Sequence, residues 1–147
     1  MAEDLCSTRA GIAAASLDRL ELLERSIDAA RGDACRHAFI STSFDSAREQ
    51  ASRAAPSSPL AGLAVSVKDL FDVAGEVTAA GSVVMASDAP ATADCPAVAR
   101  LRAAGAAFVG RTNMSEFAFS GVGINPHHGT PANAATARLD PTPRAPG

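Results

Sequence analysis

The 147-residue sequence has no tryptophan, no tyrosine and a single lysine, Lys68; its twelve other strongly basic residues are all arginine. It also lacks a block of basic residues, and its net charge of −3 gives no reason to expect a nucleic acid or an anionic membrane as a partner. No apolar run approaches the length that crosses a bilayer, and the acidic N-terminus lacks the basic region of a secretory signal.

Cysteines are few, and they are not paired in the sequence. Cys6, Cys35 and Cys95 are an odd number, are widely spaced and form no CxxC motif. This pattern favours free thiols in a reducing cytoplasm over a disulfide framework or a zinc site. Because 47% of the residues are hydrophobic and 20% are charged, the composition is that of a globular chain with a substantial core.

The first third of the chain is predicted to be helical. Apolar residues recur every three or four positions over 16–30, which predicts an amphipathic helix with Ser16 as its N-cap and Gly32 at its end. A second helix is predicted over 44–54, capped by Ser43. The sequence further suggests a short helix within 1–15, with Thr8 as a cap, and a short strand over 38–41.

A proline-rich linker, Pro56-Ser-Ser-Pro59, separates this helical part from a mixed one. We therefore predict an N-terminal helical segment over 1–56 and an α/β segment over 57–147. In the second segment, apolar runs at 63–67 and 106–110 predict two buried strands. Between them, 94–105 is expected to be a helix with Asp94 as its N-cap. Strand, helix and strand in this order form a βαβ unit with two parallel strands, so the fold class is α/β.

Polar residues follow both predicted strands. Lys68 ends the first strand, and the second is followed by Arg111 and by Asn113 and Glu116, which are spaced as a capping box for a short helix. Because functional groups of open α/β sheets gather at the carboxyl ends of the strands, we expect these residues to share one crevice. A lysine amine, unlike arginine, can be desolvated into its neutral, basic form. The structural alternative is a lysine ion-paired at the strand end beside Asp69.

Several of these segments resemble the amidase signature family. They are Gly62-Leu-Ala-Val-Ser-Val-Lys68-Asp, Ala80-Gly-Ser82, Val98–Ala106, Gly110-Arg-Thr-Asn-Met-Ser-Glu-Phe-Ala118 and Asn125-Pro-His-His-Gly-Thr-Pro-Ala-Asn133, in the order and spacing of the family. The resemblance implies the N-terminal part of the amidase-signature core, a mixed sheet with helices on both faces after a helical lead-in. It also implies that Lys68 is the catalytic lysine, acting with a bridging serine as the base that activates a nucleophilic serine. It implies no metal and no cofactor.

The sequence departs from the family pattern where it stops. In the family a glycine- and serine-rich core follows a Pro-Gly, and this sequence ends at Pro146-Gly147. The resemblance places both catalytic serines beyond that point. We therefore expect the chain to be a fragment or a truncated gene product that does not hydrolyse amides alone. The complete protein is expected to be an amidase acting on a small amide; the alternatives are the glutaminase component of a tRNA-dependent amidotransferase and a non-catalytic truncated product. Expected partners are a second copy in a homodimer or amidotransferase subunits.

Other residues are weaker candidates for a functional role. His127 and His128 are adjacent and have no third ligand nearby in the sequence, so a metal site is not favoured. Asp69 and Asp72 could act as an acid and base pair, but aspartates at a strand end more often cap turns. Ser120 is a tentative substrate-binding residue that could line the acyl pocket, and a turn serine is the equally weighted alternative.

Overall fold

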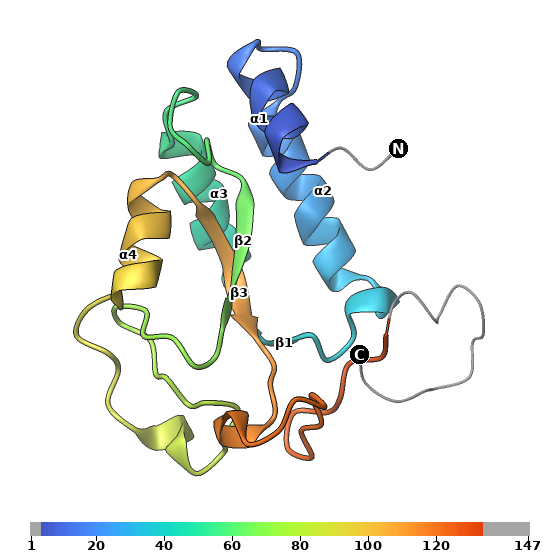
Figure 1. Ribbon diagram of the computed structural model, residues 1–147, viewed down its shortest axis with the longest axis vertical. Coiled ribbons are helices and arrows are strands. Elements are labelled where there is room, and N and C mark those ends of the chain that lie inside the picture. The colour runs from blue at the N-terminus through green and yellow to red at the C-terminus, as the bar shows by residue number, and fades with distance from the viewer. Residues whose placement is uncertain (1–3, 134–147) are drawn as a thin grey trace.

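The computed structural model describes residues 4–133 of the chain (Figure 1). It contains four α-helices and three β-strands in the described part, together with three short 3-10 turns. In chain order the elements are α1 Leu5–Ala13, α2 Arg19–Arg31, η1 Asp33–Cys35, β1 Phe39–Thr42, α3 Phe44–Arg53, β2 Ala64–Lys68, η2 Met85–Ser87, α4 Pro96–Ala103, β3 Ala107–Thr112 and η3 Glu116–Ala118.

The three strands form one mixed sheet in the order β1-β3-β2. β2 and β3 are parallel and are connected through α4, so the predicted βαβ unit is confirmed. β1 pairs with β3 in the antiparallel sense. At the carboxyl ends of the parallel strands, Lys68 lies opposite Thr112. The register of β2 and β3 shifts between Val65 and Ser66.

Helices cover both faces of this sheet (Figure 1). On one face α2 and α3 pack on β3, with Leu23, Ile27, Ala47 and Val109 in a shared apolar cluster. On the other face Val98 of α4 packs against both β2 and β3, in the second apolar cluster. Burial of these two clusters is the main stabilising term. Because β1 and the covering helices α2 and α3 precede the linker, the residues before it contribute to the same core as those after it.

Three helix starts differ from the predicted ones. α2 begins at Arg19 and is capped by Asp18, whose carboxylate accepts hydrogen bonds from two first-turn amides. Ser16 instead donates to the Gly11 carbonyl, 3.1 Å away. α1 is capped by Asp4, not by Thr8. A carboxylate is the stronger acceptor at a helix N-terminus, because it also interacts favourably with the helix dipole.

The third difference concerns α4, which begins at Pro96 and is not capped by Asp94. The Asp94 carboxylate is taken by two other donors, the guanidinium of Arg102 at 2.6 Å and the backbone amide of Ala74 at 2.8 Å. These contacts lower the pKa of Asp94, first through the hydrogen bond from Arg102. The residue therefore fastens the loop before α4 to the last turn of the same helix.

The prediction that the strand over 63–67 is buried is wrong for most of its residues. β2 lies at the edge of the sheet, with Val67 buried but Ser66 and Lys68 exposed. β3 is the central strand, and its first five residues are buried. A strand with a neighbour on one side only has an open edge, so its apolar run alone does not decide its burial.

Candidate functional site

The candidate site lies at the carboxyl ends of β2 and β3. Lys68 is the last residue of β2, and its side chain is exposed. Among residues 4–133, no carboxylate is within ion-pair distance of its amine, and no hydrogen bond to it is present. The structural alternative, an ion pair between Lys68 and Asp69, is therefore not what the described structure shows. The only lysine of the chain projects from the strand end without a charged partner in this part of the protein.

Asp69 instead points into the protein and binds Arg111 of β3. The guanidinium Nε of Arg111 donates to one carboxylate oxygen of Asp69 at 2.7 Å, and the Gly81 amide donates to the other at 2.8 Å. Both side chains are about 95% buried or more. Two further donors of Arg111 contact the Phe71 carbonyl at 2.9 Å and the Glu76 carboxylate at 3.4 Å. Buried charged groups need hydrogen-bond partners. Arg111 supplies one to Asp69 and finds two further acceptors of its own.

The loop that follows Lys68 is held by backbone contacts as well. The Asp69 amide donates to the Thr112 carbonyl at 3.2 Å, and the Ala80 amide donates to the Asp69 carbonyl at 2.9 Å. Asp72 accepts a hydrogen bond from the hydroxyl of Thr78 at 2.7 Å. The carboxylates of Asp69 and Asp72 therefore both have structural hydrogen-bond partners. The described structure gives no support to the hypothesis that they act as an acid and base pair.

Asn125 ties the segment after β3 to this loop. It is fully buried, and its side-chain nitrogen donates to the carbonyls of Gly81 and Met114 at 2.8 and 2.9 Å. Its side-chain oxygen accepts from the backbone amides of His127 and His128. One buried amide side chain therefore links the loop after β2 to the segment after β3.

The predicted capping box between Asn113 and Glu116 is wrong. The Asn113 side chain donates to the carbonyls of His37 and Gly129, at 3.0 and 2.7 Å, so it fastens loops together. Glu116 opens only the 3-10 turn η3, in which Phe117 has a positive φ of 54°. That left-handed residue prevents the turn from continuing as an α-helix.

Ser120 follows η3 and is exposed. Its hydroxyl lies 3.2 Å from the hydroxyl of Ser115, which is buried. The carboxylate of Glu116 is 3.7 Å from Nε2 of His127. The structure therefore brings Ser120 together with Ser115, and within residues 4–133 it shows no hydrogen bond between Ser120 and Lys68.

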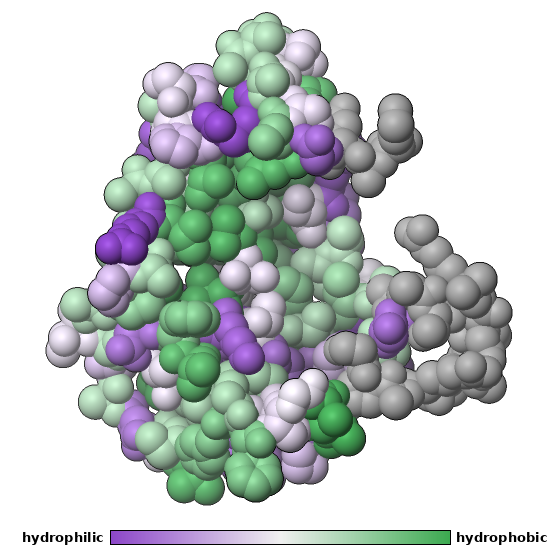
Figure 2. Space-filling view, in the orientation of Figure 1, coloured by the Kyte–Doolittle hydropathy of each residue, from purple (hydrophilic) through white to green (hydrophobic). Residues whose placement is uncertain are grey.

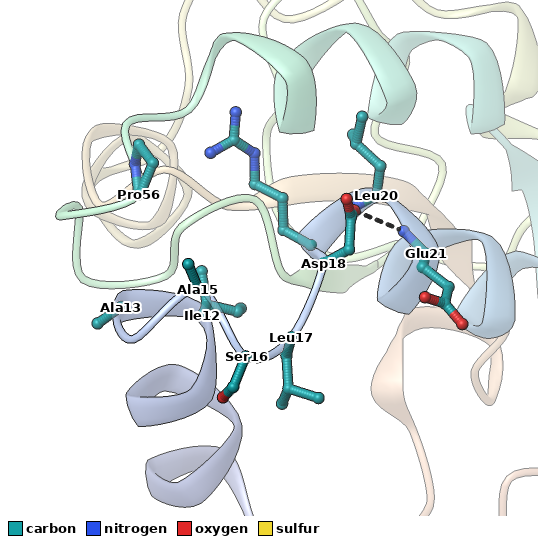
Figure 3. A pocket seen from close by; sticks show the side chains of 10 residues that line it. Ile12, Ala13, Ala15, Ser16, Leu17, Asp18, Leu20, Glu21 and Pro56 are labelled. Atoms are coloured by element: carbon teal, nitrogen blue, oxygen red, sulfur yellow. Dashed lines mark hydrogen bonds between the residues drawn. The ribbon is translucent and has the colours of Figure 1, made fainter.

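A cavity of about 330 Å³ adjoins the Asp69–Arg111 pair. Its lining residues are Ile40, Ser41, Asp69, Glu76, Val77, Ala79, Ser82, Ala86, Arg111 and His128. A second hollow of about 590 Å³ lies between the end of α1, the first turn of α2 and Pro56. In Figure 3, Pro56 lies across this hollow from Asp18 and Glu21. In Figure 1 the end of α1 and the start of α2 lie away from the carboxyl ends of β2 and β3, so we assign this hollow no part in the candidate site.

No group of His, Cys, Asp and Glu side chains that could hold a metal ion occurs within residues 4–133. The three cysteines are free thiols. Over the same residues, none of the helices combines the length and the apolar character of a membrane-spanning segment.

Sequence reasoning does not single out Arg111 as a buried ion-pair partner or Asn125 as a buried link. The apolar run ends before Arg111, whereas β3 continues to Thr112 and buries the arginine side chain. The burial of a charged residue next to an apolar run cannot be predicted from the sequence unless its partner in the folded protein is known.

Comparison with known proteins identifies the class. The family model of the amidases matches residues 14–142, and the chain therefore belongs to the Amidase family. It is 35% identical over 117 residues to the A subunit of glutamyl-tRNA(Gln) amidotransferase from Akkermansia muciniphila, a match that covers 80% of this chain and 25% of that protein. It is 40% identical over 75 residues to the AtzE subunit of 1-carboxybiuret hydrolase from Pseudomonas sp. strain ADP, over 51% of this chain and 16% of that one.

The fold agrees with this family. The native peptide amidase of Stenotrophomonas maltophilia superimposes with a TM-score of 0.71 and 26% sequence identity, over 90% of this chain and 30% of that structure. The mixed sheet and the helices that cover it thus correspond to the N-terminal part of the amidase-signature fold, as the sequence predicted. The chain spans a quarter or less of the length of the two curated relatives described above.

Proposed function

We propose that the complete protein containing this chain hydrolyses a carboxamide C–N bond with a serine nucleophile, and that Lys68 is part of the base that activates it. The observation that carries this proposal is the position of Lys68. It is exposed at the carboxyl end of a parallel strand, with no charged partner among residues 4–133, in a member of the Amidase family.

The chemistry requires an amine that can lose its proton. A neutral lysine amine can take a proton through a bridging hydroxyl, and this makes a second serine hydroxyl nucleophilic enough to attack an amide carbonyl. An ion-paired lysine would be held in its charged form, so the absence of a carboxylate partner among the described residues favours this role. The family resemblance places the two serines outside the 147 residues, and we therefore propose that this chain alone does not turn over amides.

The test replaces Lys68 in the complete gene product. Lys68→Ala and Lys68→Arg should both reduce ammonia release from a panel of primary carboxamides by about 10²- to 10⁴-fold, the range of general-base contributions. Arginine keeps the charge but cannot deprotonate, so it should not rescue. Arg53→Ala removes an exposed cation of α3 as a control and should leave the rate unchanged. Activity retained by Lys68→Arg would contradict the base role.

A second candidate is the glutaminase component of a tRNA-dependent amidotransferase, favoured by the relative from Akkermansia muciniphila that matches 80% of the chain. The two candidates share the Lys68 chemistry but differ in partners. A glutaminase component should release ammonia from glutamine only when its partner subunits are present, whereas a stand-alone amidase, as a monomer or homodimer, should be active without them. The proposal includes a cytoplasmic location, which the three free thiols support.

A further inference from the structure

We infer that Asp69 and Arg111 form a positioning pair for Lys68, one that sets both the location and the charge environment of its amine. This inference rests on the proposed function of Lys68. It assigns a role in the reaction to two residues that do not themselves contact the reacting atoms.

The end of β2 is held by the residue that follows Lys68. β2 has β3 as its only neighbour in the described sheet, so the end of β2 would fray unless something else held it. Asp69, the next residue, supplies this attachment through four hydrogen bonds: from its amide to Thr112, from Arg111 and Gly81 to its carboxylate, and from Ala80 to its carbonyl. Lys68 is therefore placed by a residue that is fixed on both its backbone and its side chain.

Arg111 joins β3 to the segment that follows Lys68. One guanidinium contacts Asp69, Phe71 and Glu76, all from the segment that follows Lys68. Arg111 itself belongs to β3 and is 4% exposed, so it is held by the central strand. Its planar fork can hold a carboxylate and a carbonyl at once, which the single ammonium of a lysine cannot do in the same geometry.

The pair also affects the electrostatic environment of the strand end. The ionisable groups around this strand end are Asp69, Asp72, Glu76 and Arg111, with His128 on the wall of the adjoining cavity. Asp69 and Arg111 carry opposite charges, so the pair adds no net charge at the strand end that Lys68 closes. Removing one member changes the net charge there by one unit, with opposite signs in the two cases.

Substitutions of Asp69 and of Arg111 should therefore change the pH dependence of the complete gene product in opposite directions. In Asp69→Asn the loss of one negative charge beside Arg111 disfavours the Lys68 ammonium, so the acidic limb of the kcat/KM profile moves to lower pH, by about one unit. In Arg111→Met the carboxylates of Asp69 and Glu76 lose their shared cation, which favours the ammonium, and the limb moves to higher pH by a similar amount. Both variants should lower kcat about tenfold or more, with little change in KM, because a misplaced base weakens the transition state.

A matched control exists in the same chain. Asp94 and Arg102 form another aspartate–arginine pair, and Asp94 also accepts a bond from a backbone amide, yet the pair fastens α4 rather than the strand end. Asp94→Asn should therefore lower the melting temperature, as the two site variants do, without moving the pH limb. Arg111→Lys should restore the position of the limb but not the full kcat.

A second measurement does not depend on catalysis. Cleavage by an arginine-specific protease at Arg53 and Arg100 yields a peptide covering 54–100 in which Lys68 carries the only side-chain amine. Brief labelling of the intact protein with acetic anhydride across a pH series, read on this peptide by mass spectrometry, follows deprotonation of that amine. The labelling midpoint should move in the same opposite directions in Asp69→Asn and Arg111→Met, and not in Asp94→Asn.

The outcomes separate the two proposals. If Lys68→Ala is fully active, the proposed function fails, while the labelling still tests the positioning pair. If Lys68 is required but Asp69→Asn and Arg111→Met shift the labelling midpoint in the same direction, or not at all, the inference is overturned. A loss of kcat in Asp69→Asn no larger than that in Asp94→Asn would overturn it as well.

Discussion

Gly110 in β3 lies directly against the backbone carbonyl of Ser41 in β1, and no side chain fits between the two strands at this point. A Cβ atom added to Gly110 would contact the Ser41 oxygen and lie 2.9 Å from the Thr42 Cα, with φ at +153°. The obstructing atoms are backbone, so they cannot rotate away. We expect Gly110→Ala to lower the free energy of unfolding by about 1–3 kcal/mol, as overpacking does, measured by chemical denaturation of the complete gene product.

Two other glycines separate this steric effect from simple backbone strain. Gly75 has a φ of +82°, but a Cβ atom added to it would have nothing within 4 Å, so Gly75→Ala should cost only the left-handed conformation, about 1 kcal/mol. Gly121 also has open space and no positive φ, and its replacement by alanine should change stability by less than about 0.5 kcal/mol. If Gly110→Ala lowers the free energy of unfolding no more than Gly75→Ala does, the strands move apart to accommodate the methyl group and the steric prediction is wrong.

The pair of Asp94 and Arg102 gives a prediction on acid stability. The folded-state pKa of Asp94 is lowered from its ordinary value of 3.8, first by the hydrogen bond from Arg102 and then by the Ala74 amide. The stabilisation is therefore complete above about pH 4 and is lost as the pH falls through the lower, folded-state pKa. Denaturation at pH 7 and at pH 2.5 should show a smaller difference in Asp94→Asn than in the unaltered protein. An equal difference in both would refute the assignment.

The sequence predicted the architecture of the region from β2 to β3 well, because its apolar runs are short and its helix is bounded by Pro96 and Gly105. Prediction from the sequence failed where two side chains compete to cap the same backbone amides. Ser16 and Asp18 are both good caps, and only the path of the chain back toward Gly11 decides that Asp18 takes the amides while Ser16 turns to a carbonyl.

The candidate site was predictable only as far as single residues go. Lys68 was singled out because it is the one lysine and follows an apolar run, and the register of the parallel strands places it opposite Thr112 of β3. Arg111, the partner of Asp69, was not predicted, because a contact between residues 69 and 111 depends on which strands are neighbours. Tertiary pairing of this kind leaves no periodic signal in the sequence.

Ser120 provides a test of the substrate side of the site. We propose that its exposed hydroxyl, 3.2 Å from that of Ser115, contacts the acyl group of the amide. Ser120→Ala should then raise KM about three- to tenfold, as expected for the loss of one neutral hydrogen bond, with kcat less affected. Ser115→Ala is the comparison, since this buried serine should affect stability more than KM. If Ser120→Ala leaves KM unchanged for every amide turned over, Ser120 is a turn serine.

The last prediction concerns the large apolar side chains exposed in the loops after β2 and β3. Within residues 4–133, eight of them are more than 40% exposed, and they are Leu70, Phe71, Val83, Val84, Phe117, Phe119, Val122 and Ile124. Figure 2 shows apolar surface at the lower end of the molecule, where these loops lie in Figure 1. Together with the open edge of β2, such a surface is expected to associate when nothing covers it.

We therefore expect the 147-residue chain, made alone, to aggregate or to unfold partially, as judged by light scattering and by binding of an anilinonaphthalene dye. Replacing Val84 and Phe119, which are 75% and 93% exposed, by serine should reduce both signals. Leu5→Ser is the control, since Leu5 is 58% exposed but lies on α1, away from these loops. A monomeric chain with a sharp, cooperative thermal transition would contradict the prediction, because an apolar surface of this kind would then be compatible with an independently folded state.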